Sequence, residues 1–217
     1  DYLVIQSENN FPTSSGLASS ASGIASFVTA YDAHYDLNLE MSNKIEACIL
    51  GSGSAPRSLI GGFVLMDHKN NYSCTQVLSK ADWPVDVLIC LASKETKKIS
   101  SRQGMEISKR TSPLYQDWLG RNDKDISLAL EAINEKDMSR LENVTEENCN
   151  FMHEVMKTSK PPIIYMNDVT HSCVAEIENL RSSGHKLFYT IDAGAQIKII
   201  CDPKSTNTIK DTIAQKT

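Results

Sequence analysis

The sequence predicts an α+β fold, because its strands and helices come in runs instead of alternating strictly. An apolar run from Val85 to Ala92 is typical of a central strand. Residues 100–156 are mainly helical in pattern, and Pro161-Pro162 ends that run. Two further strands are expected at residues 186–191 and 197–201.

The earlier part of the chain is expected to form a separate domain. Trp83-Pro84 interrupts the chain just before the central strand, so we expect one domain over residues 1–84 and a second over residues 85–217. Apolar spacing and turn signals predict the following elements in the first domain: a strand at Tyr2 to Ile5, a helix from Leu17 to about Tyr35, a helix at 41–50, and a hairpin of 59–66 with 74–78.

Composition and charge exclude several classes of function. The chain has 217 residues, 41% of them hydrophobic, and a net charge of −5 without a basic stripe, so nucleic acid is not an expected partner. No apolar stretch approaches the roughly 20 residues that span a bilayer, so no membrane partner is expected. The six cysteines form no CxxC pair, and four lie in apolar runs, which indicates a reduced, cytoplasmic protein. The five histidines are separated from one another and from cysteine, which gives a zinc site little support.

A loop of small residues, Asn9 to Gly23, lies between the first expected strand and the first expected helix. Small side chains leave backbone N–H groups and the helix N-terminus accessible to an anion, and phosphate is the obvious candidate. The alternative is an ordinary turn in which Thr13 to Ser15 cap the helix. The loop by itself does not decide between the two.

Three later segments also combine small residues with charged or hydroxyl groups. Gly51 to Ser58 contains Arg57, whose planar fork of donors suits a carboxylate or phosphate. Asp192-Ala193-Gly194 places an acid at the end of a strand, beside residues small enough for a ligand to approach. Ser100 to Met105 places hydroxyls and Arg102 at a helix start. A surface arginine, a turn aspartate and a serine cap are the respective alternatives. Together the four segments indicate a phosphate-rich pair of ligands.

These segments resemble the mevalonate diphosphate decarboxylases, a family of the GHMP kinase superfamily. The resemblance covers nearly the whole chain in the right order, and it also includes Gly61-Gly62-Phe63, Asp82-Trp83-Pro84 and Tyr165-Met166-Asn167-Asp168. It implies a two-domain GHMP-kinase-like fold, in which residues 1–84 carry the ATP-phosphate and substrate loops. It also implies ATP-dependent decarboxylation of mevalonate 5-diphosphate to isopentenyl diphosphate through phosphorylation of the 3-hydroxyl, with ATP and Mg²⁺ as cofactors, in a cytoplasmic homodimer.

The resemblance assigns a role to individual residues. Asp192 matches the catalytic acid beside the 3-hydroxyl, and Arg57 matches the residue that holds the departing carboxylate. Ser19 matches the serine near the metal ion. The remaining assignments are substrate binding by Ser52, Ser54, Arg57, Ser101, Arg102 and Met105, and ATP-phosphate binding by Pro12, Ser14, Ser15, Gly16, Leu17, Ala18, Ser19 and Ser20.

The sequence departs from the family pattern at three places. Ala195-Gln196 stands where the family usually has Pro-Asn, and Pro56 stands where it usually has Cys or another small residue. The family's N-terminal strands have no match, so we expect an incomplete N-terminal domain. The alternative functions are a GHMP small-molecule kinase, a mevalonate monophosphate decarboxylase, and a non-catalytic fragment that binds ligands or a partner chain.

Overall fold

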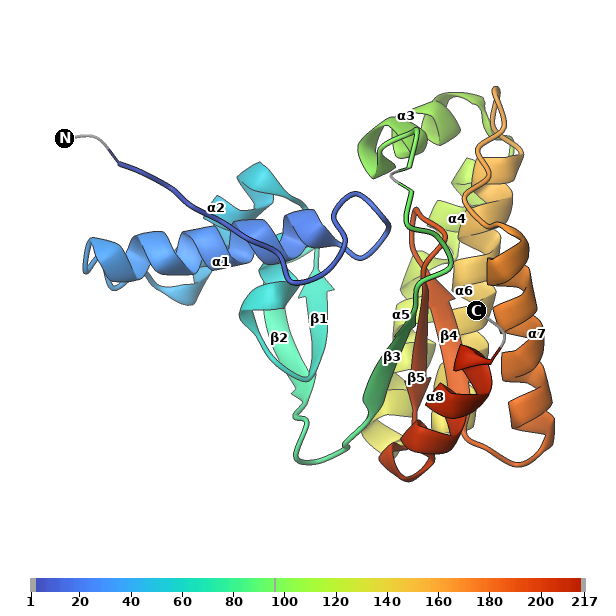
Figure 1. Ribbon diagram of the computed structural model, residues 1–217. Helices are drawn as coiled ribbons and strands as arrows, with labels where there is room; N and C mark the ends of the chain where they lie inside the picture. Colours follow the sequence, from blue (N-terminus) through green and yellow to red (C-terminus); the bar gives the residue numbers. More distant parts are fainter. Residues whose placement is uncertain (1–2, 96, 216–217) are drawn as a thin grey trace. The chain divides into compact units, whose positions relative to one another are not determined.

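The computed structural model describes residues 3–95 and 97–215, which form two compact units (Figure 1). Unit 1 comprises residues 1–80 and unit 2 comprises residues 81–217. Each unit has helices together with a small antiparallel sheet, as the expected α+β class requires. No helix within the described ranges is long and apolar enough to cross a membrane.

Unit 1 packs two helices against a short 3₁₀ turn and carries a hairpin. Small residues allow this close packing, because Ala21, Ala25 and Val28 of the first helix meet Cys48 and Ala55. The predicted helices and hairpin are confirmed. The elements are α1 (Ser19–His34), α2 (Met41–Gly51), η1 (Ala55–Leu59), β1 (Phe63–Asp67) and β2 (Ser73–Leu78), with β1 and β2 antiparallel.

The strand predicted at Tyr2 to Ile5 is wrong for the part of that segment that is described, residues 3–5. Val4 and Ile5 are 89% and 60% exposed, and residues 3–5 belong to neither sheet. A strand is stabilised by a hydrogen-bonded neighbour, and no described segment pairs with this one. The apolar pattern alone could not supply that neighbour.

Unit 2 is built on a sheet with the strand order β3-β5-β4, in which every pair is antiparallel. The three strands predicted from their apolar runs are confirmed as β3 (Asp86–Cys90), β4 (Leu187–Ile191) and β5 (Ile197–Cys201). The central position expected for the first of them is wrong, because β3 lies at the outside of the described sheet and β5 lies between its two neighbours. In β5, Ile197, Ile199 and Cys201 alternate with Lys198 and Ile200, so one face of the sheet is apolar and buried.

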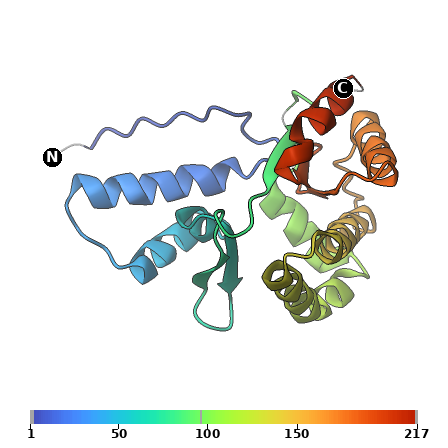
Figure 2. The same cartoon turned by 90° about the horizontal axis from the view of Figure 1, so that it is seen from below.

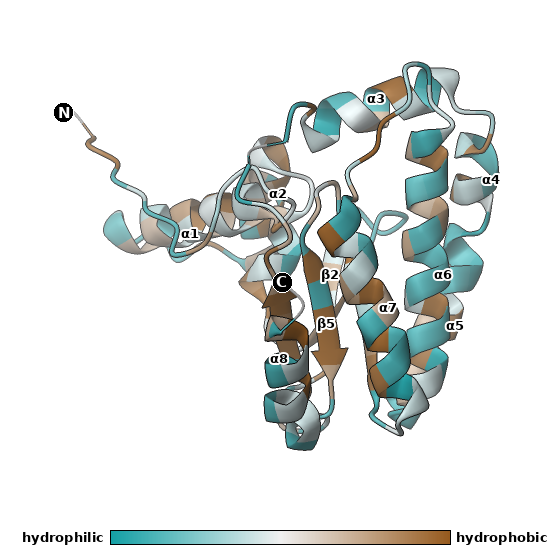
Figure 3. Ribbon diagram, turned by 45° about the vertical axis from the view of Figure 1, so that its right-hand side comes forward, coloured by the Kyte–Doolittle hydropathy of each residue, from teal (hydrophilic) through white to brown (hydrophobic). Residues whose placement is uncertain are grey.

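Helices cover that apolar face of the sheet. Ile177 and Leu180 of one helix and Ile209 and Ile213 of another join the strand residues in a single buried cluster. Figure 3 shows the brown strand β5 among helices whose exposed sides are teal. The helices are α3 (Ser101–Thr111), α4 (Tyr115–Gly120), α5 (Asn122–Glu135), α6 (Met138–Lys157), α7 (Asp168–Ser182) and α8 (Thr206–Ala214), with a 3₁₀ turn η2 (Pro203–Ser205).

Side-chain caps fix where several of these helices begin. Asn167 forms a capping box with Thr170 at the start of α7, which confirms the predicted cap, and Asp137 accepts from two backbone N–H groups at the start of α6. Lys136 takes a left-handed conformation between α5 and α6, which lets the chain reverse there. Helices α6 and α7 run side by side along the sheet (Figures 1 and 2), and Arg181 of α7 forms ion pairs with Glu142 and Glu146 of α6.

We predict that Ile199→Ala lowers the free energy of unfolding of unit 2 by about 2–5 kcal/mol, because the side chain is 1% exposed and its removal leaves a cavity. Ile89→Ala is the matched control, since Ile89 lies on β3 but is 44% exposed. Urea unfolding followed by tryptophan fluorescence measures both changes, since Trp83 and Trp118 both lie in unit 2. Equal losses in the two variants would contradict this account of the core.

Candidate functional site

The small-residue loop of unit 1 leads into α1 without a side-chain cap. The N-cap is Ala18, which has a left-handed conformation with φ 53°, and the first turn of α1 carries no acid. The interpretation that Thr13 to Ser15 cap the helix is therefore wrong, since Ser15 instead donates from Oγ to the Pro12 carbonyl over 2.9 Å. Backbone N–H groups at an uncapped helix start attract anions. The geometry fits a phosphate better than it fits an ordinary capped turn.

Left-handed backbone also shapes the loop before α1. Ser14, Gly16 and Ala18 all have positive φ, at 54°, 94° and 53°. A backbone that alternates in this way turns successive N–H groups toward one side, as in anion-binding nests. Ser19 lies at the first position of α1, where its Oγ accepts a long 3.4 Å hydrogen bond from the Ser14 N–H. That hydrogen bond joins the first left-handed residue of the loop to the start of α1.

Serine hydroxyls join this loop to the second small-residue segment. Ser20 Oγ lies 3.2 Å from Ser52 Oγ, which lies 3.3 Å from Ser54 Oγ. Arg57 follows in η1 and is exposed, whereas Pro56 is buried beside Ala55. The unusual Pro56 is therefore a packing residue, while the side chain of the neighbouring Arg57 is accessible. The structure brings Ser20 of the first loop together with Ser52 and Ser54 of the second.

A cavity of about 430 Å³ lies beside the beginning of the loop that precedes α1. Sequence reasoning missed it, although small residues one turn apart on α1 are the signal that could have revealed it. A Cβ added at Gly23 would meet nothing within 4 Å. The lining residues are Ser7, Glu8, Asn9, Asn10, Phe11, Ser22, Gly23 and Ser26.

In unit 2, Lys97 joins two segments that are distant in sequence. Its Nζ donates to Ser101 Oγ over 2.7 Å and to the Ala193 carbonyl over 2.9 Å. Burial lowers the pKa of Lys97, while the nearby charge of Asp192 opposes that change. The lysine thereby brings the start of α3 to the loop that follows β4.

Asp192 follows the last residue of β4 and forms an ion pair with Lys198 of β5. The distance from Asp192 Oδ2 to Lys198 Nζ is 2.6 Å, and the aspartate side chain is 52% exposed while the lysine is 18% exposed. An accessible carboxylate held by an ordered cation can interact with a substrate hydroxyl without losing its orientation. The alternative of a simple turn-capping aspartate does not account for this ion pair.

The unusual Ala195-Gln196 pair is anchored in the fold. Gln196 is 1% exposed and donates from Nε2 to the Ser93 carbonyl over 2.6 Å, while its Oε1 accepts from the Ser93 N–H over 3.4 Å. The Ala195 carbonyl accepts from Thr170 Oγ1 over 2.9 Å. These bonds connect the loop to the residues after β3 and to the start of α7. The loop thus remains held by the fold at this departure from the family pattern.

The start of α3 combines a structural cap with accessible polar groups. Ser100 forms a capping box with Gln103, which confirms the capping alternative for that one serine. Ser101 and Arg102 are exposed in the first turn, and Met105 is half-buried. Gly104 permits close packing, since a Cβ there would lie 2.9 Å from Tyr165 Oη. Ser101 meets the Asp192 loop through Lys97.

Sequence reasoning missed both lysines of this site. Lys198 is the only charged residue within β5, between apolar neighbours, and such an isolated charge in a buried strand is a usable signal. Lys97 stands beside Lys98 in a polar segment and has no comparable signal. Its role depends on contact with Ala193, which is 96 positions away.

Comparison with known families covers both units. The model of the mevalonate 5-diphosphate decarboxylase C-terminal domain matches residues 87–217, and the model of the diphosphomevalonate decarboxylase-like N-terminal domain matches residues 1–77. Diphosphomevalonate decarboxylase of Ganoderma lucidum is 36% identical over 214 residues, covering 92% of this chain and 53% of that protein. The Saccharomyces cerevisiae protein is 35% identical, covering 88% and 51%. The chain spans about half the length of the curated relatives it matches.

Solved structures agree with this relationship. Mevalonate diphosphate decarboxylase from Staphylococcus aureus matches with a TM-score of 0.86 and 33% identity, over 95% of this chain and 63% of that one. An enzyme designated MDDEF, in complex with MVAPP, AMPPCP and magnesium, matches with a TM-score of 0.85 and 33% identity, over 94% and 64%. The matched C-terminal domain alone covers more than half of the sequence, so the chain belongs to the mevalonate diphosphate decarboxylase family.

Proposed function

We propose that the protein takes part in the ATP-dependent decarboxylation of mevalonate 5-diphosphate to isopentenyl diphosphate. The observation that carries the proposal is the accessible Asp192 carboxylate, ordered by Lys198 and joined through Ala193 and Lys97 to Ser101. Relatives over both units carry this activity in their names, and one is described with MVAPP, an ATP analogue and magnesium. The assignment of the domains to residues 1–84 and 85–217 belongs to the same proposal.

We assign the ATP phosphates to the loop from Pro12 to Ser20. The uncapped start of α1 and the left-handed turns at Ser14, Gly16 and Ala18 fit an anion, which meets the chemical requirement for this ligand. ATP supplies the phosphoryl group that converts the substrate hydroxyl into a leaving group. The side chains of this loop are too small to crowd a triphosphate.

Ser19 is the residue that we assign to the metal ion. The described part of the chain contains no cluster of three His, Cys, Asp or Glu side chains that could hold a metal ion. Mg²⁺ usually keeps several waters and is bound through one or two protein groups together with substrate phosphates, so a serine hydroxyl suits a shared site. This assignment makes metal binding depend on the nucleotide.

Unit 1 would also hold the carboxylate end of the substrate. Arg57 can bind a carboxylate with two parallel hydrogen bonds, and Ser52 and Ser54 add hydroxyl donors from the adjoining turn. This carboxylate leaves as carbon dioxide, so the contact must orient it without stabilising the ground state as strongly as the transition state. The diphosphate end is assigned to Ser101 and Arg102 in unit 2, and Met105 is assigned to substrate binding beside them.

Asp192 would orient the 3-hydroxyl and accept its proton. One carboxylate oxygen is engaged by Lys198, so the rotation of the side chain is restricted. A carboxylate is a weak base toward an alcohol, so positioning of the hydroxyl contributes alongside proton transfer. When the 3-phosphate leaves, C3 becomes electron-deficient. The carbon–carbon bond to the carboxylate then breaks, its electrons form the new double bond to C3, and the carboxylate leaves as carbon dioxide.

Two further properties are proposed with this function. We place the protein in the cytoplasm, where the six free cysteines would remain reduced, and we propose a homodimer as its assembly. A thiol buried in an apolar core, such as Cys48 or Cys201, is a weakly reactive structural residue, since burial raises the pKa of both.

In the full-length protein, we predict that Asp192→Asn lowers kcat roughly 10²–10⁴-fold, because the amide can orient the hydroxyl but cannot accept its proton. Asp211→Asn on α8 is the control, since it removes an exposed carboxylate elsewhere in unit 2. Steady-state release of carbon dioxide measures both variants. Retained turnover in Asp192→Asn would contradict the catalytic assignment.

We predict that one ATP is consumed for each carbon dioxide released from mevalonate 5-diphosphate. A stable 3-phosphorylated product without carbon dioxide would instead identify a GHMP small-molecule kinase. Faster turnover of mevalonate 5-monophosphate would identify a monophosphate decarboxylase, which the cationic Arg102 beside Ser101 disfavours. Nucleotide binding without any product would identify a non-catalytic fragment. Product analysis by phosphorus NMR with trapped carbon dioxide separates the four outcomes.

A further inference from the structure

Strand β4 lies at the outside of the described sheet of unit 2, so one row of its backbone groups points away from β5. Alternate residues of an antiparallel strand carry these outward N–H and C=O groups, and a buried unpaired group is costly. In β4 the outward residues are Leu187, Tyr189 and Ile191. All three meet a side chain from a helix.

Helix α6 supplies the partners along most of this edge. Glu146 Oε1 accepts from the Tyr189 N–H over 3.1 Å, and Cys149 Sγ accepts from the Ile191 N–H over 3.2 Å. The Ile191 carbonyl accepts from Cys149 Sγ over 3.5 Å and from His153 Nε2 over 3.1 Å. Residues 146, 149 and 153 are three and four positions apart, so they share one face of the helix.

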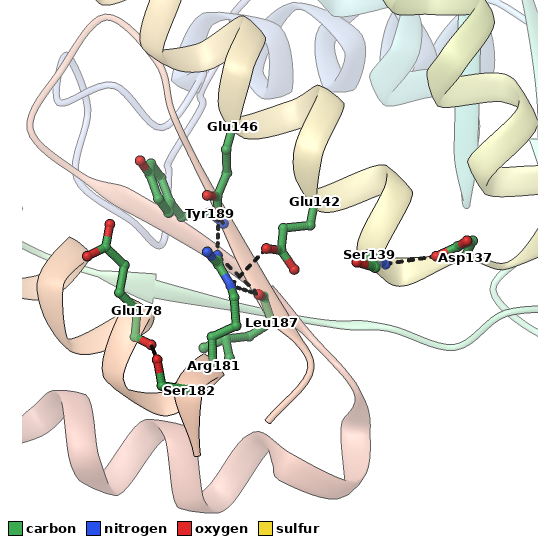
Figure 4. A network of polar contacts seen from close by, with 9 residues as sticks. All are labelled: Asp137, Ser139, Glu142, Glu146, Glu178, Arg181, Ser182, Leu187 and Tyr189. Atoms are coloured by element: carbon green, nitrogen blue, oxygen red, sulfur yellow. Dashed lines mark hydrogen bonds and ion pairs between the residues drawn. The ribbon is translucent and has the colours of Figure 1, made fainter. Parts of the chain in front are cut away.

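The first part of this edge is anchored by Arg181. Figure 4 shows the guanidinium between Glu142 and Glu146 of α6, with a further contact to the Leu187 carbonyl. The Glu146 carboxylate therefore serves both Arg181 and the Tyr189 N–H. The polar contacts continue along the strand from Leu187 to Ile191, which is the residue before Asp192.

The contacts with Ile191 determine where His153 and Cys149 carry their protons. A carbonyl oxygen only accepts, so His153 must carry its proton on Nε2 to bind Ile191. Burial lowers the pKa of His153 and raises the pKa of Cys149, which favours a neutral imidazole and a thiol. Asp192 and Lys198 are the charged groups near both side chains, and their effects on each pKa oppose one another.

We propose that Cys149 and His153 are positioning residues that hold the end of β4 and thereby set the place of Asp192. The inference rests on the proposed function, in which Asp192 meets the 3-hydroxyl. Asp192 directly follows Ile191, and side chains of α6 bind both the N–H and the carbonyl of Ile191. The Asp192 carboxylate is bound by Lys198 of β5. The acid is thus fixed from two sides. A displacement of about 1 Å at such a group can lower a rate by 10²-fold.

The test compares His153→Ala with His153→Gln in the full-length protein. His153→Ala removes the donor to the Ile191 carbonyl and is expected to lower kcat roughly 10- to 100-fold, with KM for both substrates within about twofold. His153→Gln restores an N–H donor and is expected to recover most of kcat. Asn150→Ala is the matched control, because it removes a bond from α6 to the Tyr189 side chain instead of the backbone.

A second readout uses the 217-residue chain without substrate. Nitrogen-15 shifts of His153 should show a neutral imidazole protonated at Nε2, and a proton at Nδ1 would overturn the proposal. Unchanged kcat in His153→Ala, or equal losses in the alanine and glutamine variants, would also overturn it. If the unaltered full-length protein releases no carbon dioxide from mevalonate 5-diphosphate, the proposed function fails instead, so the two failures are distinguishable.

Discussion

The pairing of β5 with both β3 and β4 is the interaction on which unit 2 depends. Because side chains alternate along a strand, this register sends Ile197, Ile199 and Cys201 into the core. The same register places Lys198 on the other face of the sheet, where it is paired with Thr190 across the strands and lies close enough to bind Asp192. One pattern of backbone hydrogen bonds therefore builds the core and orders the acid. A shift of one residue would exchange the two faces.

Side chains bonded to backbone groups then hold the segments that leave the sheet. Gln196 binds Ser93 after β3, Asn167 donates from Nδ2 to the Ala92 carbonyl, and Thr170 binds Ala195. Each bond joins segments that are distant in sequence. Loops at the ends of strands lack regular hydrogen-bond partners, so such contacts order them without a further strand. The candidate site of unit 2 lies on these ordered ends.

The proposed anion site of unit 1 relies on different groups. Its loop has no charged side chain between Asn9 and Ser20, and its positive φ angles and the uncapped start of α1 supply the N–H groups. Small residues serve two purposes here, because Ala21 and Ala25 also allow α1 to pack closely on its neighbours. Arg57 is a separate and exposed cationic group of this unit, and its guanidinium suits a ligand with its own carboxylate.

The sequence by itself determined the α+β class, the strands of the unit 2 sheet, the helix and hairpin of unit 1, and the family, because local periodicity and short motifs carry that information. It also indicated Asp192, Arg57 and the serine loops. Tertiary structure alone decided three features: the strand expected at residues 2–5 lacks a partner in the described part, Lys97 joins Ser101 to Ala193, and Cys149 with His153 binds Ile191. The histidines had been interpreted as isolated from cysteine, although Cys149 and His153 are four residues apart on one helix face. These features depend on contacts between distant segments, and only the packed chain supplies the neighbours.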